Sequence, residues 1–289
     1  MSDKPKRLSD QELKDQLLEK SGQKEKVETI KELDFPTEII ELPSKGIPYP
    51  EDNPLSSGKV EMKYMTAKEE DILTNQSFIK QGVVLDKLFK SLIVSPIPYH
   101  ELLLCDKNAI MIAARVLGYG KDYTVEIPDP FNNLEKQETT IDLTTLEDKP
   151  LHEQIKKYPN TMEFEFELPV SKKRLSFKLM THGSEKRVEY TLKDVKKKQK
   201  KLKDETDRGL STRLKHSIIA VDGEKDTKEI SKFVDDHLLA LDARAFRNYV
   251  KQITPDIDTN FTFTSNETGD EQEMEIPIEV SFFWPDVTI

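Results

Sequence analysis

The chain has 289 residues, of which 36% are hydrophobic and 34% are charged, and its net charge at pH 7 is −10. This acidic total argues against general nucleic-acid binding, which requires neutralised phosphates, and the single cysteine, Cys105, excludes an intramolecular disulfide and a four-cysteine zinc site. We expect about two domains, and no membrane span, because no apolar stretch approaches the required length.

Residues 1–33 are mostly charged and polar, which predicts a solvated, flexible arm; the alternative is an arm that orders on a partner. The stretch FPTEIIELPSKGIPYPEDNPLSSG then holds five prolines and two glycines, which excludes a regular helix. We expect a short strand at residues 39–42, a turn at Ser44–Gly46, and an ordered, non-helical connection over Leu42–Pro50.

A strand and three helices are expected next. Alternation of Val60, Met62 and Tyr64 predicts a half-buried strand, and Thr66 with Glu69 forms a capping box that starts a helix. The second helix carries an apolar stripe of Val84, Leu85, Leu88, Phe89, Leu92 and Ile93. The third is expected to begin at Asp106 as its cap, to bury Ala109, Ile110, Ala113, Val116 and Leu117, and to stop at Gly118 and Gly120.

The apolar period then changes from 3.6 to 2, which predicts two β-hairpins. DYTVEIP and TTIDLTT form the first, across the loop PDPFNNLEKQE, and MEFEFEL and LSFKLM form the second, across PVSKKR. A lysine-rich helix follows, then SIIAV, which fits a helix or a strand. Two more helices are expected, the last with Asp242 as its cap, before the closing strands NFTFT and EMEIPIEVSFF.

This order predicts an α+β fold with two small helical clusters and antiparallel β-hairpins. We divide the chain into the arm at 1–33, an N-terminal lobe at 34–148 and a C-terminal lobe at 149–289. The boundary is placed within residues 144–159, which are rich in charge and include two prolines.

No residue pattern indicates catalysis, a cofactor or a metal. The five histidines include no pair at helical ligand spacing, and Cys105 fits a buried structural position. Seven lysines lie between Lys193 and Lys203 without interleaved aromatic residues, so they form either a solvated helix face or an electrostatic dock for an acidic partner. Lys196, Lys197 and Lys200 are the candidate contacts of such a dock.

The aromatic end, SFFWPD, supplies the second candidate site. Phe282 continues the apolar face of the closing strand, on which Met274, Ile276, Ile278 and Val280 also lie, and this face is expected in the core. Phe283 falls on the opposite face. Phe283 and Trp284 are therefore predicted to contact either a partner protein or another part of this chain.

Three stretches together, LPSKGIPYP, LLLCDKNAIMIAARVLGYGKDYTVEI and SFFWPD, resemble the baseplate-hub and hub-assembly proteins of T-even-type contractile-tailed bacteriophages. The resemblance covers most of residues 35–145 and returns in 205–286. It implies a non-enzymatic structural component of the baseplate hub, made in the host cytoplasm and located in the virion tail. The alternative is an assembly chaperone that binds a tail protein, such as the tape measure, and leaves before maturation.

The partners that the resemblance implies are other tail and baseplate proteins, and a homo-oligomer within the baseplate is left open. It also implies Cys-x-x-Cys pairs, suited to zinc, at two hairpin tips of many relatives. Those places read PDPFNN and TFTSNETGD here, so Asp, Asn, Pro and Gly turn chemistry is expected to hold both tips without metal.

Overall fold

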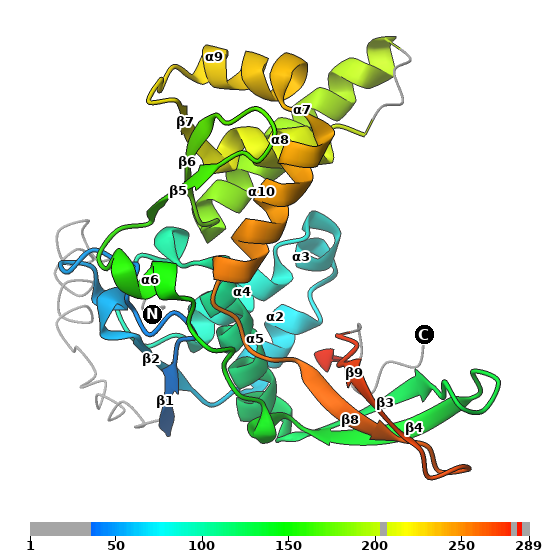
Figure 1. Ribbon diagram of the computed structural model, residues 1–289. Coiled ribbons are helices and arrows are strands. Elements are labelled where there is room, and N and C mark those ends of the chain that lie inside the picture. Colours follow the sequence, from blue (N-terminus) through cyan, green and yellow to red (C-terminus); the bar gives the residue numbers. More distant parts are fainter. Residues whose placement is uncertain (1–35, 203–206, 279–281, 285–289) are drawn as a thin grey trace, which may run out of the picture. The chain divides into compact units, whose positions relative to one another are not determined.

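The computed structural model describes residues 36–202, 207–278 and 282–284, with the backbone alone described for residues 200–202. Helices alternate with small antiparallel sheets of two or three strands (Figure 1), which confirms the predicted α+β class. The predicted arm at 1–33 lies outside the described residues, so it stays a prediction.

The first sheet pairs β1 (Thr37–Glu41) with β2 (Lys59–Lys63), and the loop between them carries η1 (Pro54–Ser57). The predicted turn at Ser44–Gly46 is confirmed, because Lys45 and Gly46 both have positive φ. A Cβ on Gly46 would lie 2.3 Å from the carbonyl oxygen of Ser56, so only glycine fits at this position. The segment that follows the turn is non-helical, as predicted, and is largely buried.

The helical cluster after β2 consists of α2 (Ala67–Leu73), α3 (Gln76–Gln81), α4 (Val84–Leu92), η2 (Tyr99–Glu101) and α5 (Leu104–Tyr119). The predicted capping box forms at the start of α2, and Ile110 and Leu117 lie in the core at 0% and 8% exposure, as the α5 stripe predicts. The predicted cap of α5 was wrong. The helix begins two residues before Asp106, which is fully buried within the first turn, where its carboxylate binds a distant loop.

The predicted hairpins are both present. β3 (Asp122–Pro128) pairs with β4 (Lys136–Asp142), which is followed by η3 (Leu143–Thr145) and α6 (Glu153–Lys157). β5 (Glu163–Glu167) pairs with β6 (Arg174–Lys178), and β7 (Ile218–Val221) adds to β6 as a third strand. The SIIAV segment, which fitted a helix or a strand, is therefore mostly a strand. Three of the four residues of β7 are buried, so the strand extends the apolar core beside β6.

The second helical cluster consists of α7 (His182–Leu202), α8 (Gly209–Ser217), α9 (Thr227–Lys232), the π-helical η4 (Phe233–His237) and α10 (Ala240–Ile253). Asp242 was predicted to cap α10, but the helix begins at Ala240. The Asp242 carboxylate instead accepts hydrogen bonds from the backbone N–H groups of Val170 and Ser171, in the loop between β5 and β6. Local sequence could not indicate that partner, which lies about seventy residues earlier.

The last hairpin pairs β8 (Asn260–Thr264) with β9 (Glu271–Glu275). The predicted closing strand was too long, because β9 ends at Glu275 and Pro277, which has no N–H to donate, follows two residues later. Ile278 was expected on the core face but is 45% exposed, and Val280, expected on the same face, lies outside the described residues.

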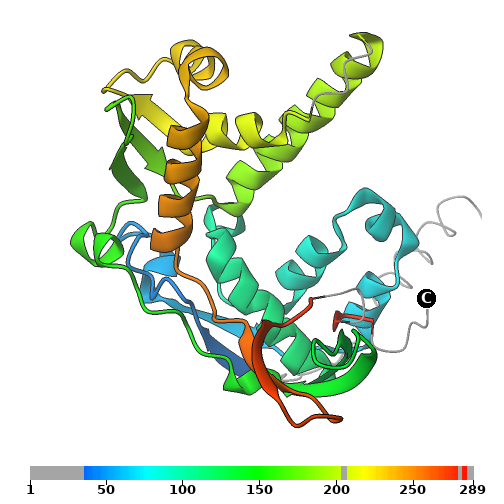
Figure 2. The ribbon, with the colours of Figure 1, turned by 45° about the vertical axis from the view of Figure 1, so that its right-hand side comes forward.

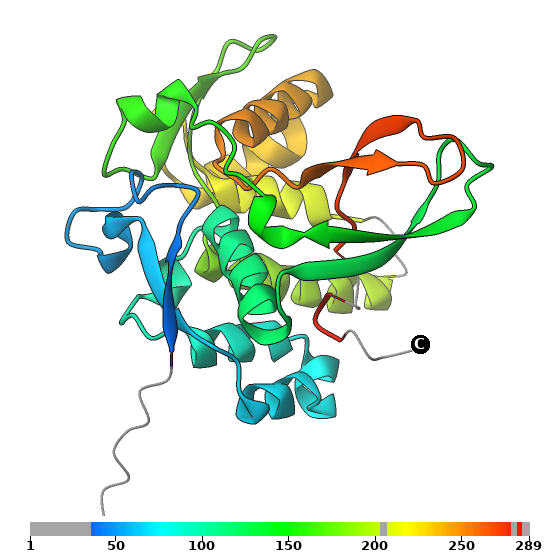
Figure 3. The ribbon, with the colours of Figure 1, turned by 90° about the horizontal axis from the view of Figure 1, so that it is seen from below.

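The residues from Thr37 onward group as one compact unit, and their buried side chains form a shared core. The division into two lobes near residue 148 stays a prediction. The segment around the predicted boundary contacts the N-terminal part of the fold. Lys45 forms an ion pair with Asp148, and the N–H of Asn160 donates to the carbonyl of Ile47 at 2.8 Å. The final hairpin returns to lie beside the β3–β4 hairpin (Figure 3), so segments more than 120 residues apart in the sequence contact each other.

Candidate interaction sites

A buried polar centre joins the proline-rich loop to α5. The Asp106 carboxylate accepts hydrogen bonds from the Ser44 N–H at 3.0 Å, the Ser44 hydroxyl at 2.8 Å and the Tyr49 hydroxyl at 2.7 Å. The Tyr49 oxygen in turn accepts from the N–H of Leu103 at 2.8 Å. Burial raises the pKa of Asp106, although its three donors act in the opposite direction. These contacts explain why the LPSKGIPYP loop is ordered without forming a helix or a strand.

The first two aromatic residues of the chain end lie in the core. Phe282 is 1% exposed and its ring centroid lies 5.1 Å from that of Tyr123, which confirms its predicted burial. Phe283 is 3% exposed and lies 6.2 Å from Phe89 of α4 and 5.2 Å from Phe282. Of the two contacts considered for Phe283, the structure therefore shows the one with another part of this chain. Almost no surface of the Phe283 side chain is left for a partner.

Trp284 is half-buried beside this cluster. Its Nε1–H donates a hydrogen bond of 3.0 Å to the carbonyl of Leu73, the last residue of α2, and its ring centroid lies 6.3 Å from that of Phe283. The indole thus also contacts its own chain, while part of its surface stays open to solvent. A contact between that open part and a partner stays a prediction.

The two hairpin tips are latched to each other. The Ser265 hydroxyl donates to the Asp129 carboxylate at 2.6 Å, and both side chains are 2% exposed. The Gln137 side chain spans the same pair of hairpins, since it donates to the carbonyl of Thr264 at 2.9 Å and accepts from the N–H of Asn266 at 2.8 Å. Polar side chains therefore join the two hairpins, which lie side by side (Figure 3). Sequence analysis expected turn chemistry within each tip and did not predict this link between them.

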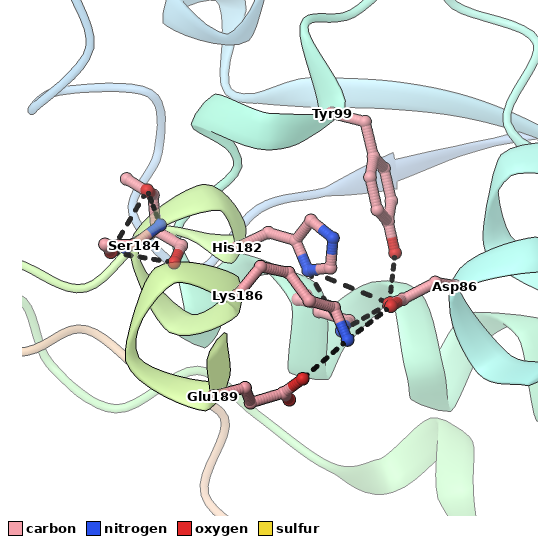
Figure 4. Close-up of polar contacts among 8 residues, drawn as sticks. Asp86, Tyr99, His182, Ser184, Lys186 and Glu189 are labelled. Atoms are coloured by element: carbon pink, nitrogen blue, oxygen red, sulfur yellow. Dashed lines mark hydrogen bonds and ion pairs between the residues drawn. The ribbon is translucent and has the colours of Figure 1, made fainter. Parts of the chain in front are cut away.

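The base of α7 is fixed by a cluster around Asp86 of α4 (Figure 4). The carboxylate accepts from Lys107 of α5 at 2.8 Å and pairs with Lys186 of α7 at 3.0 Å, while His182 Nδ1 lies 3.7 Å away. Burial alone would raise the pKa of Asp86, but the hydrogen bonds from both lysines outweigh it and lower that pKa. Burial lowers the pKa of His182, whose ring packs edge-on to Tyr99 at 4.7 Å.

The outer part of α7 presents the predicted lysines. The side chains of Lys193, Lys196 and Lys197 are exposed, whereas the side chain of Lys200 lies outside the described residues. Tyr190, which sequence analysis did not single out, is 72% exposed one turn before them. The lysines and the aromatic end belong to different elements, and no contact recorded among the described residues joins them.

Among the residues that the structure describes, no group of three or more histidine, cysteine or acidic side chains is placed to hold a metal ion. Within the same residues, no helix has the length and apolar character needed to cross a bilayer.

Comparison of the chain with models of known protein families identifies its family. Residues 38–284 match the family described as T4 bacteriophage base plate protein. The chain belongs to this family. Membership indicates a structural role in the phage tail baseplate, in contact with other baseplate proteins. Comparisons with curated proteins and with solved structures find no match.

Sequence reasoning missed the Asp86 cluster of this baseplate protein. Its members Asp86, Lys107, His182 and Lys186 come from three helices that are far apart in the sequence, so no local spacing brings them together. The available signal was weak: Asp86 lies in the first turn of α4, which buries Val84 and Leu88, so a carboxylate stands close to buried residues.

Proposed function

We propose that this chain is a non-enzymatic structural component of the baseplate hub of a contractile phage tail, acting through protein–protein contacts. The observation that carries the proposal is the family match over residues 38–284, which spans almost all of the described fold. The hub assignment rests further on the LPSKGIPYP and SFFWPD stretches, which resemble hub and hub-assembly proteins. Both stretches pack against the first helical cluster, through Asp106 and Phe89 respectively.

A structural role also suits the chemistry of the reactive side chains. Cys105 is 4% exposed and burial raises its pKa well above the ordinary value, so the thiol stays protonated at neutral pH. His182 is 94% enclosed between Tyr99 and the Asp86 cluster. Neither group has the exposed, activated setting that nucleophilic or acid–base catalysis requires.

The other role to separate from this proposal is that of an assembly chaperone, which would bind a tail protein such as the tape measure and then depart. The test is quantitative mass spectrometry of purified virions and of tail-assembly intermediates from the same infected culture. An abundant baseplate protein of the same phage serves as the internal standard. A hub component is expected at a constant ratio to the standard in intermediates and virions. Its presence in intermediates and loss from virions would overturn the hub proposal in favour of the chaperone.

A further inference from the structure

The charge of this chain is strongly segregated. Residues 252–289 contain nine acidic and no basic side chains, so this segment carries −9 of the net charge of −10. The excess of positive charge is concentrated on α7, whose lysines lie between Lys186 and the end of the helix. Such polarity provides two surfaces of opposite sign on one molecule.

The α7 helix projects from the rest of the fold (Figure 2). The positive surface is its outer face, which consists of Tyr190, Lys193, Lys196 and Lys197, all exposed. Tyr190, Lys193 and Lys197 fall on one helical stripe, so the aromatic ring lies in line with the charges. None of these three lysines forms an ion pair with another described residue. The helix is held at its base by the Lys186–Asp86 pair and by the fully buried Val188.

The negative surface is β9, where Glu271, Glu273 and Glu275 alternate on one face and are all exposed. β8–β9 is a two-stranded sheet, so one edge of β9 has no strand beside it among the described residues. The glutamates recur about every 7 Å along the strand. Lys193 and Lys197, four residues apart on the helix, are separated by about 6 Å along its axis. The two rows of charge therefore have nearly matching spacing.

We propose that the outer face of α7 is a docking surface for the glutamate face of β9 in a second copy of this chain. The occupant is a second copy because both complementary rows are present in this one sequence, yet no ion pair among the described residues joins them. Each copy carries one row of each sign, so the contact is head-to-tail and closes a ring or extends a chain. Tyr190 supplies an apolar anchor amid the charges. This inference does not depend on the hub assignment.

The net charge of −10 opposes association of two copies, and ionic strength decides the balance. At about 0.15 M salt the Debye length is about 8 Å, so repulsion between distant acids is screened more than attraction between touching rows. We therefore expect self-association to be weaker at about 0.5 M salt than at about 0.15 M salt, because the ion pairs in the contact are then screened as well.

The experiment measures self-association of the purified full-length chain by sedimentation velocity at about 0.15 M and about 0.5 M salt. It compares the wild type with three triple charge reversals. The helix variant carries Lys193→Glu, Lys196→Glu and Lys197→Glu; the strand variant carries Glu271→Lys, Glu273→Lys and Glu275→Lys; the control carries Lys225→Glu, Lys228→Glu and Lys232→Glu at exposed positions near and on α9. The control changes the net charge as much as the helix variant does, and circular dichroism establishes that each variant is folded.

The helix and strand variants should each self-associate at least about tenfold more weakly than the wild type, while the control stays within about twofold. An equimolar mixture of the helix and strand variants should associate again, because the acidic helix of one then faces the basic strand of the other. A wild type that remains monomeric, or a mixture that fails to associate, would overturn the proposal. Tight binding of short duplex DNA by a monomeric wild type, lost in the helix variant, would assign the lysines to nucleic acid instead.

Discussion

Glu69 is a fully buried carboxylate whose charge we expect to stabilise the fold. Its Oε1 accepts from Lys63 at 2.9 Å and from the Ser91 hydroxyl at 2.7 Å, and its Oε2 accepts from the N–H of Thr66 at 3.0 Å and the Thr66 hydroxyl at 2.6 Å. Burial alone would raise the pKa of Glu69, but these four donors outweigh it and lower the pKa to about 2. Together the contacts tie the end of β2, the start of α2 and the side of α4 to one group.

The test is Glu69→Gln, which keeps the shape of the side chain and removes the charge. A pKa lowered from 4.5 to about 2 corresponds to about 3 kcal/mol of free energy of unfolding at pH 7. Because the folded-state pKa lies below the unfolded one, this stabilisation is complete above about pH 5 and is lost as the pH falls toward about 2. At pH 3 about 1 kcal/mol should remain.

Urea unfolding of the wild type and the variant measures how much free energy of unfolding Glu69→Gln costs at pH 7 and at pH 3. Glu70→Gln is the matched control, since Glu70 is the next residue in the same helix turn and is exposed. The control should change the free energy of unfolding by less than about 0.5 kcal/mol at either pH. Equal costs of Glu69→Gln at pH 7 and pH 3 would refute the reasoning, because a purely steric effect has no such pH dependence.

Three further outcomes follow from the described contacts. Phe283→Ala should lower the free energy of unfolding by about 3–5 kcal/mol, because the ring is buried. The control, Ile278→Ala at an exposed position, should cost less than about 1 kcal/mol. Similar urea midpoints for the two variants would show that Phe283 is not a core residue. Tyr49→Phe should cost about 1–3 kcal/mol, because the buried Leu103 N–H loses its acceptor, and an unchanged midpoint would contradict that role. Ser265→Ala should speed amide exchange at the tips of both hairpins but not in α5, and protection that is unchanged at the tips would argue against the latch.

Local patterns predicted most secondary structure because period and capping are properties of neighbouring residues. The α5 stripe containing Ile110 and Leu117, the capping box at Thr66 and the alternating hairpin strands all depend on such neighbours. Two of the predictions that were wrong involve side chains whose partners are distant. Asp106 and Asp242 have the residue type of a helix cap, but both serve loops that are far away in the sequence.

The candidate interaction sites show the same division. Lys196 and Lys197 are exposed, which either predicted role of the lysine-rich helix requires, and their role as partner contacts stays a prediction. The burial of Phe283 could not be predicted from strand alternation, because β9 ends at Glu275. The Phe283 ring instead packs against Phe89 of α4. That contact depends on core packing, where burial of a large ring outweighs the local pattern.

The placement of this fold within the baseplate is the most direct test of the central claim. A cryo-electron microscopy map of the tail baseplate from purified virions should contain density that fits the described residues in the central hub, with their helices and hairpins connected as in Figure 1. Density that fits this fold only at the periphery of the baseplate, or at no position in a map that resolves the whole hub, would contradict the account.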